Sequence, residues 1–124
     1  MLAFIKIIYA VIVGAILGYE RELSKKPAGL RDIILVTLGA LIFTLLNDPQ
    51  NRMIANIITG VGFLGGGVII KNTDYVEGVT TAVVLWLAVG MGTAIGLGKF
   101  FLVFLALVIA SGVLYFKRMK EILK

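Results

Sequence analysis

The chain has 124 residues, of which 60% are hydrophobic and 15% charged, and its mean hydropathy is +1.04. A chain with this composition has too few polar residues to cover the surface of a water-soluble domain of this size. We therefore expect a membrane protein. The net charge is +5, but the basic residues lie between and after hydrophobic runs, which argues against nucleic-acid binding. The chain has no Cys or His, which removes thiolate nucleophiles and the usual zinc and haem sites, so we do not expect an enzyme.

Five hydrophobic segments predict an all-α integral membrane protein with a single domain over residues 1–124. In chain order they are roughly Leu2 to Tyr19, Ile33 to Leu46, Met53 to Ile70, Val79 to Gly98 and Phe100 to Phe116. At 1.5 Å per residue the third and fourth reach about 27 to 30 Å, enough to cross a membrane. The second segment is shorter, and it can cross only if it begins near Gly29 and takes Arg31 and Asp32 into or near the interface.

The connecting segments predict the orientation of these spans. One side of the membrane receives nine basic residues, which are Arg21, Lys25, Lys26, Arg31, Lys71, Lys117, Arg118, Lys120 and Lys124. The other side receives Lys6, Arg52 and Lys99. By the positive-inside rule the N-terminus lies outside and the C-terminus in the cytoplasm, which agrees with an odd number of spans. The strongest turn signal falls at Asn47 to Pro49.

The stretch TGVGFLGGGVII at residues 59–70 contains five glycines within eight positions. A glycine loop facing lipid is excluded, because backbone groups in hydrocarbon need internal hydrogen bonds. We interpret the glycines as a helix-packing feature, since small residues four apart let two helices approach closely. Such pairs occur at Gly14/Gly18, Gly62/Gly66 and Gly92/Gly96. The alternatives are a gating hinge or a helix broken at Gly65 to Gly67, whose carbonyls would meet an ion in a polar cavity.

The segment GYERELSKKPAGLRD at residues 18–32 contains the charges that flank the first two spans. Glu20 and Arg21 end the first helix, and Arg31 and Asp32 open the second, where an acidic residue suits the positive end of the helix dipole. We expect Glu20, Arg21 and Arg31 to form an ion-pair cluster at the membrane face, because partly buried charges need partners. The other charges are interpreted as a solvated loop, namely Glu22, Lys25 and Lys26.

At these residues the chain resembles the MgtC/SapB family of membrane proteins. The resemblance is carried by GYER at 18–21, PAGLRD with the following ILVTLGA at 27–40, RMIANIITGVGFLGGGVII at 52–70 and GVTTAVVLWLAVGMGTAIGLGKF at 78–100. The chain departs from the family pattern at Asp32, Ile33 and Gly66, and we expect it to lack the soluble cytoplasmic C-terminal domain of many members. The candidate functional residues are positions that match the family motifs, together with Asp32 and Asn56. They are Glu20, Arg21, Gly29, Arg31, Asp32, Arg52, Asn56, Gly62, Gly65, Gly67, Thr80, Thr81 and Trp86.

The resemblance implies a multi-pass protein of the bacterial cytoplasmic (inner) membrane, linked to magnesium limitation and membrane energetics. It implies a regulator that packs against membrane partners such as the F-type ATP synthase, and we expect a homodimer and no resident cofactor. The alternative is a small transporter or channel for Mg²⁺ or another ion, with Glu20 and Asp32 at its cytoplasmic mouth. Trp86 is interpreted as a helix-packing anchor or as a residue of the interfacial aromatic belt, and its place about a third of the way into the fourth segment favours packing.

Overall fold

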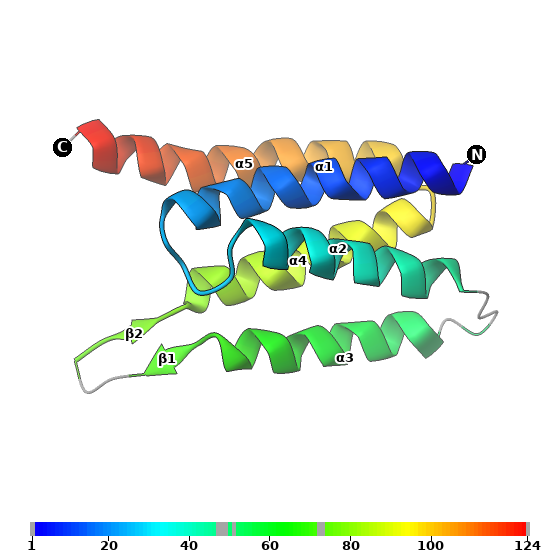
Figure 1. Ribbon diagram of the computed structural model, residues 1–124, viewed down its shortest axis with the longest axis horizontal. Helices are drawn as coiled ribbons and strands as arrows, with labels where there is room; N and C mark the ends of the chain where they lie inside the picture. Colours follow the sequence, from blue (N-terminus) through cyan, green and yellow to red (C-terminus); the bar gives the residue numbers. More distant parts are fainter. Residues whose placement is uncertain (1, 47–49, 51, 72–73, 124) are drawn as a thin grey trace.

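The computed structural model describes residues 2–46, 50, 52–71 and 74–123, and within them it shows an all-α bundle (Figure 1). The helices are α1 (Leu2–Leu23), α2 (Leu30–Leu45), α3 (Arg52–Gly67), α4 (Val79–Gly96) and α5 (Phe100–Leu123). A short antiparallel hairpin joins α3 to α4, with β1 (Ile70–Lys71) paired to β2 (Val76–Glu77). The expected turn at Asn47 to Pro49 lies outside the described residues.

Among the described helices, α1, α4 and the Phe100–Lys117 part of α5 are long and apolar enough to cross a membrane. Helices α2 and α3 have 16 residues each, which gives a length of about 24 Å. Helix α2 begins at Leu30, directly after Gly29, so it takes in Arg31 and Asp32 as its span requires. The all-α membrane fold predicted from the sequence is therefore confirmed.

Two helix ends differ from the sequence prediction. Helix α1 continues to Leu23, two residues beyond the predicted end at Glu20 and Arg21, so these two residues lie within its last turns. Helix α3 ends at Gly67, three residues before the predicted end at Ile70, because the chain turns there into the hairpin. Gly78 closes this connection with a φ of 89°, and a Cβ at that position would collide with the carbonyl of Val68.

Helix α3 remains helical through Gly65 to Gly67. The structure therefore does not show the break that the ion-coordinating alternative requires at these glycines. Gly65 is buried, and a Cβ built on it would lie in ordinary contact with Ala82 of α4, 3.5 Å from its Cβ. Gly65 therefore packs on α4, although a methyl group would also fit at this position.

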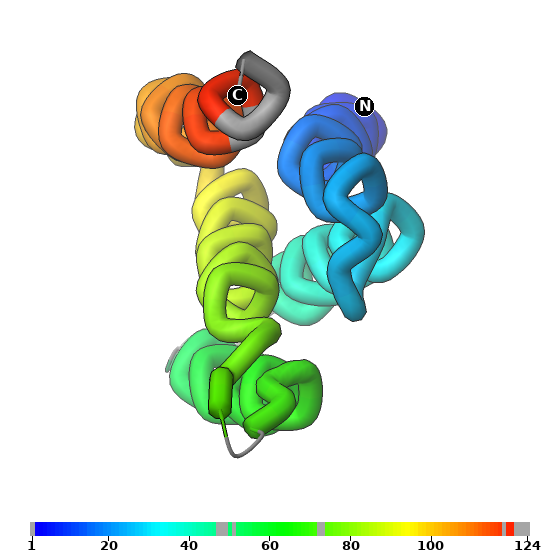
Figure 2. Tube along the Cα trace, turned by 90° about the vertical axis from the view of Figure 1, so that its left-hand side faces the viewer, coloured from blue at the N-terminus to red at the C-terminus, as the bar shows by residue number. Residues whose placement is uncertain are grey.

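Helix α4 is at the centre of the bundle, where it contacts each of the other four helices (Figure 2). Helix α1 packs along α2, and both pack on α4, whereas α3 packs mainly on α4 and touches α2 little. The largest fully buried side chains include Leu17 of α1, Ile33 of α2 and Ile95 of α4. The core therefore lies between α1, α2 and α4, and α3 is attached to one side of it.

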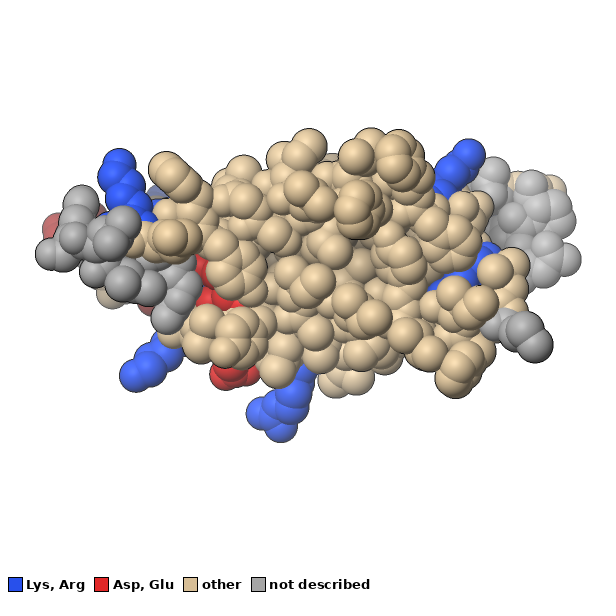
Figure 3. All heavy atoms as spheres, turned by 90° about the horizontal axis from the view of Figure 1, so that it is seen from above, with Lys and Arg blue, Asp and Glu red and all other residues tan. Residues whose placement is uncertain are grey.

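The two ends of the bundle differ in which connections they hold. The loop after α1, the hairpin and the C-terminus lie at one end, and the N-terminus and the join between α4 and α5 lie at the other (Figure 1). Figure 3 shows most charged side chains of one face toward its two ends, with a further Lys or Arg at its lower edge near mid-length and uncharged residues over the rest.

Two of the three glycine pairs bring helices into close contact with α2. A Cβ on Gly14 would lie 2.8 Å from the Cα of Ile34, and a Cβ on Gly18 would lie 3.0 Å from the Cα of Leu30. From the other side, a Cβ on Gly92 would collide with the carbonyl oxygen of Thr37. A Cβ on Gly96 would lie 2.6 Å from the Cγ2 of Thr44. The packing interpretation is confirmed for these pairs.

At the end of the bundle opposite the C-terminus, α1 binds the turn between α4 and α5. Lys6 is only 8% exposed, and its Nζ donates to the carbonyl oxygen of Gly96 at 2.8 Å. The Tyr9 hydroxyl donates to the carbonyl oxygen of Phe100 at 2.9 Å. A cation at the last carbonyls of a helix complements the helix dipole, so this apolar segment can hold its one lysine.

Replacing Gly92 by Ala should destabilise the bundle, because the new methyl group has to displace α2. Overpacking of this kind costs about 1–3 kcal/mol. The matched control is Gly90→Ala in the same helix, where nothing lies within 4 Å of a built Cβ. We expect the free energy of unfolding in detergent, followed by circular dichroism, to fall for Gly92→Ala and to stay level or rise slightly for Gly90→Ala. Equal stability of the two variants would contradict the packing of α4 on α2.

Candidate functional site

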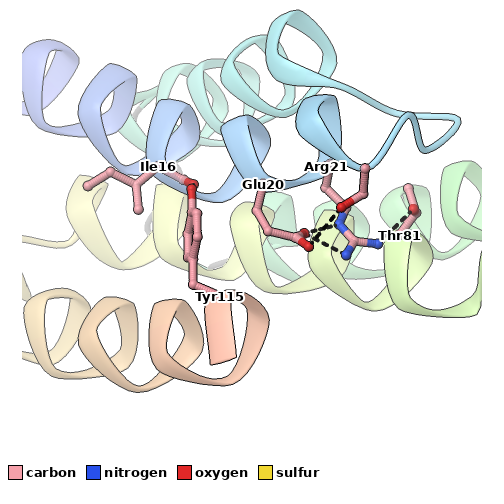
Figure 4. A network of polar contacts seen from close by, with 6 residues as sticks. Ile16, Glu20, Arg21, Thr81 and Tyr115 are labelled. Carbon is pink, nitrogen blue, oxygen red and sulfur yellow. Dashed lines mark hydrogen bonds and ion pairs between the residues drawn. The ribbon is translucent and has the colours of Figure 1, made fainter. Parts of the chain in front are cut away.

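A buried ion pair lies near the end of α1, where that helix faces α4 (Figure 4). Glu20 and Arg21 are 3% and 5% exposed. The Arg21 Nη2 lies 2.5 Å from Oε2 of Glu20, and Arg21 Nε donates to the same oxygen at 2.6 Å. Two nitrogens of the guanidinium therefore bind one carboxylate oxygen.

Neighbouring hydroxyl groups complete the network. The Ser24 hydroxyl donates to Oε1 of Glu20 at 3.2 Å, and Arg21 Nη1 approaches the Thr81 hydroxyl oxygen of α4 at 3.4 Å. Thr81 itself is fully buried. Both carboxylate oxygens are thus engaged, and the positive and negative charges cancel within the interface between α1 and α4.

Helix α5 forms a hydrogen bond with α1 one turn before this ion pair. The Tyr115 hydroxyl donates to the carbonyl oxygen of Ile16 at 2.8 Å (Figure 4). In a bilayer such a bond between helices satisfies a phenol that lipid cannot. The end of α1 is therefore bound by polar contacts to both α4 and α5.

The loop between α1 and α2 is organised by a residue that the sequence analysis assigned to solvent. Oε1 of Glu22 accepts a hydrogen bond from the backbone N–H of Leu30 at 2.9 Å, and Oδ2 of Asp32 accepts one from Gly29 at 3.1 Å. A Cβ on Gly29 would lie 2.6 Å from Oε1 of Glu22. Glu22 is exposed, as expected, but it lies in the last turn of α1 and also caps the start of α2.

Only part of the predicted site is brought together. Glu20, Arg21 and Thr81 share one network, as described above. Arg31 is exposed in the first turn of α2 and forms no ion pair with the residues that the structure describes, so its place in the predicted cluster is not supported. The physical reason is that Arg31 lies on the outward face of α2, whereas Ile33 of the same turn points into the core.

The remaining candidates lie at the surface of the chain. Arg52, Asn56 and Gly62 of α3 are exposed, as are Gly67 and Thr80. Trp86 is 56% exposed, so the expectation that it anchors packing inside the chain was wrong. The side chain stands on the outer face of α4 while Leu85 and Ala88 face the core.

Two hollows flank α3. The larger, of about 540 Å³, lies between α2 and α3 and is lined by Val36, Gly39 and Phe43 of α2 and by Asn56, Gly60 and Leu64 of α3, among others. The smaller, of about 360 Å³, lies between α3 and α4 and includes Gly62, Gly66, Val83 and Trp86. No charged residue lines either hollow. In the described part of the chain, no three His, Cys, Asp or Glu residues are grouped closely enough to hold a metal ion.

Comparison with known proteins finds a matching family and several sequence relatives. Residues 7–122 match the model of the MgtC family. Protein MgtC of Salmonella typhimurium is 40% identical over 101 residues, and Protein SapB of Bacillus subtilis is 36% identical over 110 residues. An uncharacterized protein of Haemophilus influenzae is 33% identical over 118 residues.

These matches cover most of the present chain but a smaller share of the relatives. The alignment with the Salmonella protein covers 77% of this chain and 44% of that protein. The alignment with SapB covers 76% of this chain and 47% of SapB, and the alignment with the Haemophilus protein covers 82% of this chain and 49% of that protein. The chain therefore spans about half the length of these relatives. No solved structure matches the chain.

Removing one partner of the buried ion pair should be strongly destabilising. Arg21→Gln leaves the Glu20 carboxylate buried without its countercharge, which costs about 3–5 kcal/mol. In the double variant Glu20→Gln/Arg21→Gln no charge remains buried, so much of that loss should be recovered. The exposed Lys26→Gln serves as control and should change stability by less than about 0.5 kcal/mol. The free energy of unfolding in detergent is measured for all three variants. A double variant less stable than Arg21→Gln would contradict the interpretation that Arg21 neutralises the buried Glu20 carboxylate.

Proposed function

The chain belongs to the MgtC family, and from that premise we propose that it is a non-catalytic regulator in the bacterial cytoplasmic membrane. In this proposal it crosses the membrane five times, with its N-terminus outside, and acts by packing its helices against other membrane proteins. The proposed setting is magnesium limitation and membrane energetics, with the F-type ATP synthase as partner. The support for that setting is the resemblance of the glycine and charged-loop motifs to the family.

The observation that carries the proposal is a glycine pair without a neighbour in the described chain. We call the exposed surface formed by Gly62 and Gly66 of α3 with Val83 and Trp86 of α4 the outer glycine face. Nothing lies within 4 Å of a Cβ built on Gly62 or Gly66, although the other two pairs contact α2 closely. In lipid, small residues at this spacing favour the approach of another helix. The outer glycine face is therefore suited to a helix of a membrane partner.

The distribution of basic residues supports the proposed orientation. The exposed Lys25, Lys26 and Lys71 belong to the end of the bundle that also holds the C-terminus. That end would face the cytoplasm, where loops rich in Lys and Arg are retained. Helices α2 and α3, at about 24 Å, would cross a hydrocarbon core only with their charged ends at the interface.

Ion transport, the alternative drawn from the sequence, finds little support among the described residues. Mg²⁺ requires several oxygen ligands in near-octahedral geometry. The Glu20 carboxylate is already bound by Arg21 and Ser24, and neither hollow beside α3 is lined by a charged residue. Asp32 is engaged with the backbone of Gly29. We therefore prefer the regulatory function.

Proteoliposomes containing a bacterial F-type ATP synthase test this function directly. Adding the chain should reduce ATP-driven proton pumping, measured with a pH-sensitive dye. The double variant Gly62→Ile/Gly66→Ile fills the outer glycine face and should abolish the reduction. Gly112→Ile in α5 is the control, because Gly112 is also exposed with nothing within 4 Å of a built Cβ.

Two results would contradict the proposal. Unchanged proton pumping in the presence of the wild-type chain would remove the ATP synthase as partner. Pumping reduced equally by the wild type and by the double variant would remove the outer glycine face as the contact surface. Uptake of Mg²⁺ by vesicles containing the chain alone, above that of empty vesicles, would instead favour the transport alternative.

A further inference from the structure

The larger hollow, which we call the α2/α3 groove, lies on a different side of α3 from the outer glycine face. It has a volume of about 540 Å³ and includes Gly39 of α2 and Gly60 of α3. Nothing lies within 4 Å of a Cβ built on either glycine. The backbones of both helices are therefore open to close approach by a further helix.

Asn56 sets the chemistry of this groove. Its side chain is exposed, and it forms no hydrogen bond with the residues that the structure describes. It lies four residues after Arg52, about 6 Å along the helix, and so inside the span when Arg52 is at the interface. An amide in hydrocarbon without a partner is unfavourable, and an acyl chain offers it no hydrogen bond. The occupant of the groove must therefore carry polar atoms at this depth.

The groove-facing residues of α3 form one continuous stripe. Met53, Asn56, Gly60 and Leu64 are separated by three, four and four positions, which places them on one face of the helix. The stripe combines one amide with one glycine between apolar side chains. Such a face suits a helix whose own small and polar residues lie at matching heights.

We infer that the groove binds α3 of a second copy of this chain. Two copies inserted in the same direction can be related only by a two-fold axis along the membrane normal, so residues at the same depth face each other. Asn56 then meets Asn56 of the second copy, and each amide can donate to and accept from the other. Gly60 meets Gly60 of the second copy and lets the helices approach.

Charge does not oppose a second copy at this surface. Each chain carries a net charge of +5, so two copies repel wherever their basic ends come close. No charged residue lines the groove, so a second copy can bind there without bringing charged side chains of the lining together. The proposal rests on the proposed helix-packing function, but it leaves the outer glycine face free for another membrane protein.

Cysteine cross-linking in lipid vesicles tests the contact. The chain has no Cys, so a single introduced thiol reports one position. With copper phenanthroline and oxygen as oxidant, Gly60→Cys should form a disulfide-linked dimer, because its Cα would lie near the two-fold axis. Gly62→Cys is the matched control in the same helix, with equally open space on the outer glycine face, and should not cross-link.

A second variant tests the amide itself. Asn56→Leu should weaken dimerisation roughly three- to thirtyfold, the range expected for interhelical hydrogen bonds in membranes. The control is Thr59→Val, which removes a hydroxyl group from another exposed position of α3, where it is bound to the carbonyl oxygen of Ala55. Single-molecule photobleaching of labelled chains in vesicles measures the dimer fraction, and circular dichroism verifies that each variant keeps its helices.

Three results would overturn the inference. They are a monomeric wild type, preferential cross-linking through Gly62→Cys, and an Asn56→Leu variant that dimerises as well as the wild type. The readout is oligomeric state alone, so it is independent of proton pumping. A monomeric wild type that still acts on the ATP synthase would refute this inference only, and a dimeric wild type without that action would refute the proposed function only.

Discussion

The close contact of α2 with both α1 and α4 is the constraint on which the rest of the bundle depends. Gly14 and Gly18 allow α1 to pack closely on one side of α2, and Gly92 and Gly96 allow α4 to pack closely on the other. In lipid there is little hydrophobic drive to bring helices together, so stability comes from such close packing and from hydrogen bonds between helices. Because α2 is short, its place in the core also depends on neighbours that hold its two ends at fixed depth. At its first turn Glu22 of α1 does this, by accepting a hydrogen bond from the backbone N–H of Leu30.

Within this frame the buried charges have structural partners. The Glu20–Arg21 pair lies between α1 and α4 and cancels its own charge, and Lys6 binds the last carbonyls of α4 at the opposite end of the bundle. A charge in this setting is costly without a partner. The bonds from Lys6 to Gly96 and from Arg21 to Thr81 also join α1 to α4 and so limit how far α1 can slide along it. The polar network of α1 is therefore a positioning device for the bundle rather than a binding site for a metal ion.

Helix α3 differs from the other helices because one glycine-rich sequence performs two tasks there. Gly65 packs on α4 and keeps α3 attached, while Gly60 and Gly62 open in different directions where the described chain offers no neighbour. The scaffold and the proposed contact surfaces are thus separate. A rigid core of α1, α2 and α4 carries a helix with two exposed faces, which suits a protein that acts by binding other helices.

The sequence by itself determined the membrane class, the helices, the pairing of loops with the two ends, and the family, because hydropathy, charge and local motifs are properties of neighbouring residues. It also identified Glu20 and Arg21 as charges in need of a partner. Only the tertiary structure decided that Thr81 joins them, that Arg31 does not, and that Glu22 caps a helix eight residues later. The glycine pairs show the same limit. Their spacing is alike in α1, α3 and α4, and which of them meets a neighbour depends on how the helices are arranged around α4, which no local pattern encodes.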